Sequence, residues 1–110
     1  MPESKIPYPD HSVLAQPWTY ELIELLYRRN PSGVRDDTLH LTLAKSDRTV
    51  RLLFRGVREF QIDSGFPCTV GLMILDISEN QWEGLSVEVG SYENSGGVPR
   101  FYARSVEQVT

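Results

Sequence analysis

Few side chains in this 110-residue chain could do nucleophilic or acid–base chemistry, and they lie far apart in the sequence. Cys68 is the single cysteine, and neither His11 nor His40 is near it, so a Cys–His pair would form only through the fold. His40 alternates with threonines, which is more typical of a solvated strand residue than of a zinc ligand. We therefore predict no catalytic, cofactor or metal site. An enzyme that uses Asp76 and His40 remains an alternative.

Two carboxylates, Asp76 and Glu88, are candidates for an acid–base pair. Asp76 ends an apolar stretch, and Glu88 lies in the next stretch of alternating residues. Paired carboxylates work as acid and base when their environments differ. The sequence nevertheless favours a simpler role for Asp76, in which its side chain caps the backbone N–H groups of a turn at residues 78–81.

The charges are segregated along the chain. Residues 59–99 contain seven acidic side chains and no lysine or arginine. Within them Trp82 stands between Glu79 and Glu83, an arrangement that could give an apolar anchor with an acidic rim for a basic protein surface. The alternative is that Trp82 closes the end of the core. The predicted partner-binding residues are Asp76, Glu79, Trp82, Glu83, Glu88 and Glu93.

The net charge of −4 argues against nucleic acid as the partner. An arginine row does run from Arg48 to Arg58, but Phe54 is predicted on the opposite strand face, and no aromatic side chains that could stack on bases are interleaved with the arginines on their own face. No stretch approaches the roughly 18 apolar residues of a membrane span, and residues 1–10 do not resemble a signal peptide. With a single cysteine, these features predict a cytoplasmic protein that binds neither nucleic acid nor membrane.

The elements that must position these residues are mostly predicted strands. Four prolines make residues 1–17 an irregular arm. Residues 18–29 fit two structures. As a helix they place Glu21, Glu24 and Arg28 on one stripe opposite Leu22 and Leu25, and the local pattern favours this. As a strand they would match the β pattern of everything that follows.

From residue 37 onward the hydrophobic period is two. Residues 37–45 predict a half-buried strand, and residues 49–63 a long strand with a bend at Gly56. Residues 68–77 are apolar on both faces, which predicts a strand that is central or covered on both sides. Two further strands are predicted, around residues 85–89 and over residues 100–109. Gly96 and Gly97 supply the turn between them.

Short connections between successive strands favour antiparallel neighbours. We therefore predict a mainly β fold, a curved antiparallel meander of five to six strands that forms a sandwich or a partly open barrel. Residues 18–29 are either a packing helix or the first strand. The length predicts one domain over residues 1–110, with its compact body over residues 18–110. An exposed sheet edge would allow a homodimer.

Three segments carry a family resemblance: residues 51–57 (RLLFRGV), residues 75–78 (LDIS) with residues 82–85 (WEGL), and residues 101–105 (FYARS). Together they are similar to small stand-alone bacterial proteins, some of which are grouped with the immunity proteins of polymorphic toxin systems. The resemblance implies a binding protein without chemistry of its own, and it assigns no active residue.

Three functions follow as expectations. The first is a non-catalytic protein-interaction module, of immunity type, whose acidic face binds a basic partner. The second is a small-molecule-binding β domain with an apolar pocket lined by Met73, Tyr92, Phe101 and Tyr102. The third is a protein with weak enzymatic potential.

Overall fold

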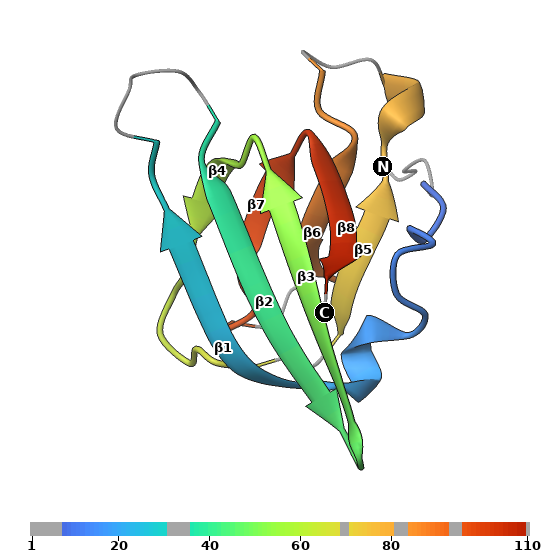
Figure 1. Cartoon of the computed structure of the whole chain (residues 1–110), viewed down its shortest axis with the longest axis vertical. Coiled ribbons are helices and arrows are strands. Elements are labelled where there is room, and N and C mark those ends of the chain that lie inside the picture. The colour runs from blue at the N-terminus through green and yellow to red at the C-terminus, as the bar shows by residue number, and fades with distance from the viewer. Residues whose placement is uncertain (1–7, 31–35, 69–70, 81–83, 93–95, 110) are drawn as a thin grey trace.

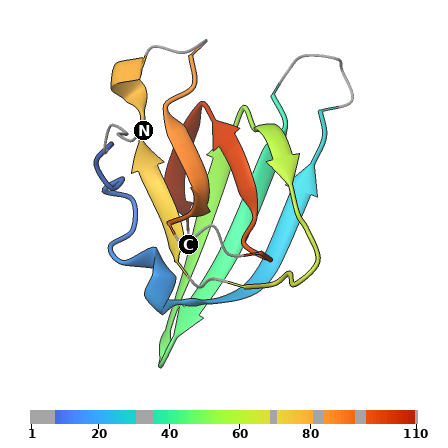
Figure 2. The same ribbon diagram turned by 180° about the vertical axis from the view of Figure 1, so that it is seen from behind.

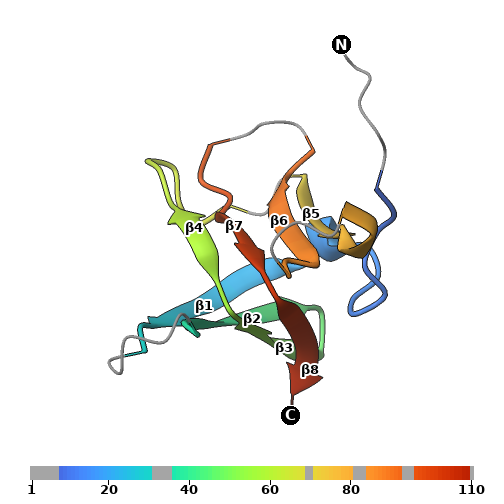
Figure 3. The ribbon, with the colours of Figure 1, turned by 90° about the horizontal axis from the view of Figure 1, so that it is seen from above.

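The protein is a sandwich of two antiparallel sheets, described here from a computed structural model for residues 8–30, 36–68, 71–80, 84–92 and 96–109. The two layers face each other in Figure 3. Sheet one has the order β1-β2-β3-β8 and forms the near layer of Figure 1; sheet two has the order β4-β7-β6-β5 and is nearer the viewer in Figure 2. The strands are β1 (Glu21–Arg28), β2 (Thr38–Lys45), β3 (Arg48–Arg55), β4 (Arg58–Gln61), β5 (Leu72–Asp76), β6 (Val87–Ser91), β7 (Arg100–Ala103) and β8 (Ser105–Val109).

The mainly β prediction is confirmed, in its sandwich form. The sheets do not close into a barrel. Two short 3-10 turns accompany the strands, η1 (Pro17–Thr19) and η2 (Ser78–Asn80). No helix in the described residues is long and apolar enough to cross a membrane.

The core lies between the sheets and comes from the alternation predicted for each strand. Leu39, Leu41 and Leu43 of β2 are completely buried. Phe54 of β3 packs edge to face on Phe101 of β7, with ring centroids 4.9 Å apart, and so joins the two layers. Because alternate side chains point to opposite faces, the neighbours of these residues form the outer faces of the sandwich.

The chain passes from one sheet to the other at two adjacent corners. The first lies at Gly56 between β3 and β4, where φ is +67° and a side chain would be strained. The second lies at Arg104 between β7 and β8, and the Arg104 N–H donates to the Arg55 carbonyl at 2.8 Å. The long strands predicted at residues 49–63 and 100–109 are therefore each divided into two strands, one in each sheet. This is why the residues described contain eight strands rather than the five or six expected.

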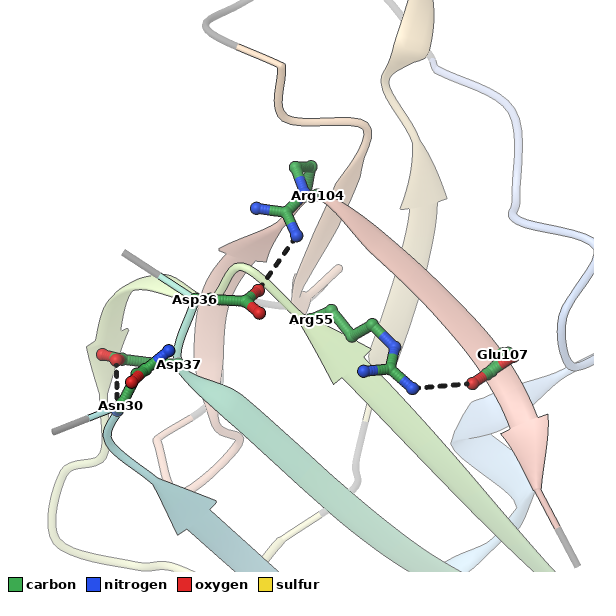
Figure 4. Close-up of polar contacts among 6 residues, drawn as sticks. All are labelled: Asn30, Asp36, Asp37, Arg55, Arg104 and Glu107. Atoms are coloured by element: carbon green, nitrogen blue, oxygen red, sulfur yellow. Dashed lines mark hydrogen bonds and ion pairs between the residues drawn. The ribbon is translucent and has the colours of Figure 1, made fainter. Parts of the chain in front are cut away.

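Polar contacts secure the end of sheet one beside these corners (Figure 4). The Arg104 guanidinium donates to Asp36 at 2.9 Å, and Arg55 reaches Glu107 of β8 at 3.4 Å. The Asn30 N–H donates to the Asp37 carboxylate at 3.0 Å and so links the end of β1 to the start of β2. The two ion pairs are exposed, and each contributes at most about 1 kcal/mol.

Within residues 18–29, Glu21–Arg28 form a strand, and the helix favoured by the local pattern is wrong. β1 pairs with β2 from Glu21↔Ala44 to Arg28↔Thr38, with a register shift between Leu22 and Glu24. Pairing with β2 satisfies the backbone and turns Leu22 and Leu25 toward the core. Tertiary pairing therefore overrides the helical spacing of the charges.

The N-terminal arm packs along the edge of β5. Asp10 forms an isolated bridge with Leu75, and the His11 N–H donates to the Ile74 carbonyl at 2.8 Å. Leu14 of the arm is buried in the core. The predicted strand at residues 68–77 is shorter, at Leu72–Asp76, and it lies at a sheet edge rather than centrally. Both of its faces are nevertheless covered, since Leu75 packs in a second cluster with Ile77, Leu85, Tyr8 and Tyr102.

Candidate functional site

The fold does not assemble the expected acid–base groups. His40 pairs with Leu26 and Leu53 on the outer face of sheet one, whereas Asp76 ends β5 in sheet two, so the core separates them. Cys68 is half-buried and packs against the core. No group of three or more His, Cys, Asp or Glu side chains in the described residues could hold a metal ion.

Asp76 has the capping role that the sequence favoured. Its carboxylate accepts the Ser78 N–H at 3.0 Å and the Ser78 hydroxyl at 2.7 Å, at the start of η2. These hydrogen bonds hold the pKa of Asp76 below its usual value of 3.8. Glu88 lies opposite Leu75, one position away from Asp76, so the two carboxylates project from opposite faces of sheet two. They do not form an acid–base pair.

The six predicted partner-binding residues are only partly described. Trp82, Glu83 and Glu93 lie outside the described residues. Glu79 is exposed in η2, and Asp76 is occupied by Ser78. Of the three described acids in the set, Glu88 lines a hollow in the surface.

This hollow has a volume of about 260 Å³ and lies on the outer face of sheet two, the sheet nearer the viewer in Figure 2. Register places its side chains in two rows across the strands. Glu88 of β6 is opposite Tyr102 of β7, and Gln61 of β4 is opposite Arg100 of β7. Glu59, Met73 and Gly90 complete its polar and apolar walls.

Two backbone features create the hollow. Gly90 is buried, and a Cβ added there would lie 3.2 Å from the Met73 methyl carbon and 3.9 Å from Arg100 side-chain atoms. A side chain at this position would therefore occupy the space. Glu59 sits in a register irregularity of β4 with φ +57°, a left-handed conformation that non-glycine residues rarely adopt. Such strain is often found at binding sites.

Burial and negative charge both act on the Tyr102 hydroxyl. Partial burial raises the pKa of Tyr102, and the negative charges of Glu88 and Glu59 raise it further. Positive charge is also present, because Arg100 lines the hollow and Arg58 lies opposite Tyr102 in the same row. The site therefore presents two carboxylates and a guanidinium to one small volume. It suits a ligand that carries a cationic group beside a hydrogen-bond acceptor or an anion.

The sequence identified this site in part. Met73, Phe101 and Tyr102 were predicted to line a pocket, and they do, but Tyr92 does not line it and the walls are polar as well as apolar. Glu59, Gln61 and Arg100 were missed as lining residues. Nothing in the local pattern signals the left-handed backbone of Glu59, whereas Gly90, which directly follows the strand predicted around residues 85–89, is a readable signal of open space.

Comparison with known proteins gives no match: no protein-family model, curated protein or solved structure is significantly similar to the chain. Function is therefore inferred from the geometry of the hollow and the chemistry of its walls.

Proposed function

We propose that the protein is a non-catalytic interaction domain that binds a basic side chain of a partner protein in the hollow of sheet two. The observation that carries this proposal is the convergence of Glu59 and Glu88 on one volume beside Tyr102. A lysine or arginine side chain fits such a volume and would form charge-assisted hydrogen bonds with both carboxylates.

Two features support binding without catalysis. Asp76 is occupied by Ser78, and His40 lies on the other sheet, so the groups that could have acted together are separated. The resemblance to immunity-type proteins points the same way, since it implies a protein that acts by occupying its partner. Arg100 refines the expected partner: the basic side chain should stand next to a carbonyl or carboxylate that Arg100 can bind.

A titration with blocked amino acids tests this function. Nα-acetyl-lysine methylamide and its arginine counterpart should shift the backbone amide resonances of Gly90 and Tyr102 in the isotope-labelled protein. The double variant Glu59→Gln/Glu88→Gln should weaken binding about tenfold or more, since two charge-assisted contacts are lost. The control is Glu107→Gln, which removes the same charge from the outer face of sheet one. The proposal fails if the shifts map elsewhere, or if the control weakens binding equally.

A small-molecule function is favoured by one further observation, the presence of Arg100 among the carboxylates. In this second candidate function the ligand is a free zwitterion of amino-acid type, with its amine at Glu59 and Glu88 and its carboxylate at Arg100. Arg100→Gln distinguishes the two functions. The variant should abolish binding of free lysine if a zwitterion is the ligand, and should weaken binding of the blocked lysine only modestly, by the loss of one carbonyl contact, if a protein side chain is the ligand.

A further inference from the structure

β1 is the long open edge of the sandwich. It pairs with β2 on one side only, and it forms the outer edge of sheet one in Figure 1. The other three edges in the described residues are short or covered. β4 has four residues and the irregularity at Glu59, the arm covers β5, and β8 has five residues, with the Gln108 side chain donating to the Val13 carbonyl. Unpaired backbone N–H and C=O groups on such an edge are a template for another strand.

The side chains of β1 are unusually apolar for an exposed edge. Ile23 is 58% exposed, Leu26 49% and Tyr27 39%. Natural edges are commonly protected by lysine, proline or a bulge. β1 contains neither lysine nor proline, and its register shift lies at its beginning, between Leu22 and Glu24. The stretch from residue 24 to residue 28 is regular.

The charges of this regular stretch are complementary to themselves in the antiparallel direction. Glu24 stands at its beginning and Arg28 at its end, both on the outer face because they pair with Thr42 and Thr38 of β2. If Leu26 of one copy is opposite Leu26 of another, each Glu24 is opposite an Arg28. On the inner face the same register places Leu25 opposite Tyr27. A two-fold axis through Leu26 therefore satisfies every side chain of the stretch.

We infer that two copies of this chain associate through antiparallel pairing of residues 24–28 of β1, with a two-fold axis at Leu26. The two copies of sheet one would then form one continuous sheet of eight strands. This interface does not involve the hollow, which lies on the outer face of the other sheet, so it stands or falls independently of the proposed function.

Charge exchange tests both the association and its register. Sedimentation equilibrium of the full chain should show a concentration-dependent dimer. Glu24→Arg and Arg28→Glu should each raise the dissociation constant about tenfold or more, because each converts two attractive cross-strand pairs into two repulsive ones. The double variant Glu24→Arg/Arg28→Glu should restore the dimer. An equimolar mixture of the two single variants should form a heterodimer.

Two controls separate this register from others. Glu21 lies outside the paired stretch, so Glu21→Arg should leave the dissociation constant unchanged. In a dimer whose register is shifted by two residues, Glu21 would be opposite Arg29, and the same variant would weaken association. In a Cys68→Ser background, Leu26→Cys should form a disulfide-linked dimer on mild oxidation, whereas Thr42→Cys on β2 should not. The inference is overturned if the chain is monomeric up to millimolar concentration, or if the dimer is indifferent to charge reversal at both positions.

Discussion

Replacement of Gly56 by alanine should destabilise the fold more than replacement of Gly84. Both glycines have positive φ, +67° and +78°, so alanine is strained at each. They differ in their surroundings. A Cβ at Gly56 would lie 2.8 Å from the Arg104 Cβ and 3.0 Å from its Nη1, whereas no described atom lies within 4 Å of a Cβ at Gly84. Gly84 is therefore a matched control for backbone strain without crowding.

The expected loss of stability has two contributions, backbone strain and steric crowding. The left-handed conformation costs alanine about 1–2 kcal/mol at either position. Crowding against Arg104 adds about 1–3 kcal/mol at Gly56, the usual range for an overpacked site. The Arg104 Cβ is attached to the backbone of the second corner, so it moves only if that corner moves. We expect a loss of about 2–5 kcal/mol for Gly56→Ala and about 1–2 kcal/mol for Gly84→Ala.

Urea unfolding followed by tryptophan fluorescence measures both losses. Arg104→Gly in combination with Gly56→Ala should recover the crowding contribution, since it removes the Cβ that the new methyl group meets. Arg104→Ala, which keeps that Cβ, should recover little. If Gly56→Ala costs no more than Gly84→Ala, the close approach of the two corners is not the reason for glycine at this position.

Three other predictions concern single side chains. Asp76→Ala should cost about 0.5–1 kcal/mol at neutral pH. Because Ser78 lowers the pKa of Asp76 in the fold, this deficit should shrink as the pH falls below the usual 3.8 and vanish below the lowered pKa, which urea unfolding at a series of pH values measures. Tyr92 donates to Asp10, and partial burial followed by this hydrogen bond raises its pKa from 10.0 to about 12. Its contribution to stability is therefore present below pH 10 and lost as the pH rises toward 12, so Tyr92→Phe should flatten the alkaline decline of the urea midpoint. Glu59→Gly should remove the left-handed strain and raise stability by up to about 1 kcal/mol in urea unfolding, while it weakens binding of the blocked lysine; a loss of stability would contradict strain at this residue.

The sequence predicted the fold correctly where alternating hydrophobic residues mark a strand and a glycine marks its bend. The alternating leucines of residues 38–45 correctly predicted the buried face of β2. Gly56 predicted a bend, and the chain passes from one sheet to the other at that residue. The second corner, at Arg104, carries no glycine or proline, and its position is set by the first corner against which it packs. No local pattern could indicate it.

The hollow of sheet two was likewise predicted only in part. Its methionine and two of its aromatic residues, Met73, Phe101 and Tyr102, were predicted to line a pocket. The residues that were missed, Glu59, Gln61 and Arg100, lie next to one another only because β4 pairs with β7, a contact between segments about forty residues apart. Charge segregation along the chain was therefore a poor guide to charge in space: Arg100 stands beside carboxylates that the sequence keeps separate from basic residues.

The ambiguity of residues 18–29 has a physical cause that bears on the interface. A strand with one solvated face alternates apolar and polar residues, but β1 has apolar side chains on both faces, Leu25 inward and Leu26 outward. Such a sequence fits helical spacing better than a simple edge strand in water. In the proposed dimer Leu26 would contact its counterpart across the two-fold axis, which would bury part of this outward apolar surface. The outward leucine that made a helix the better local fit is thus the residue at the centre of the proposed interface.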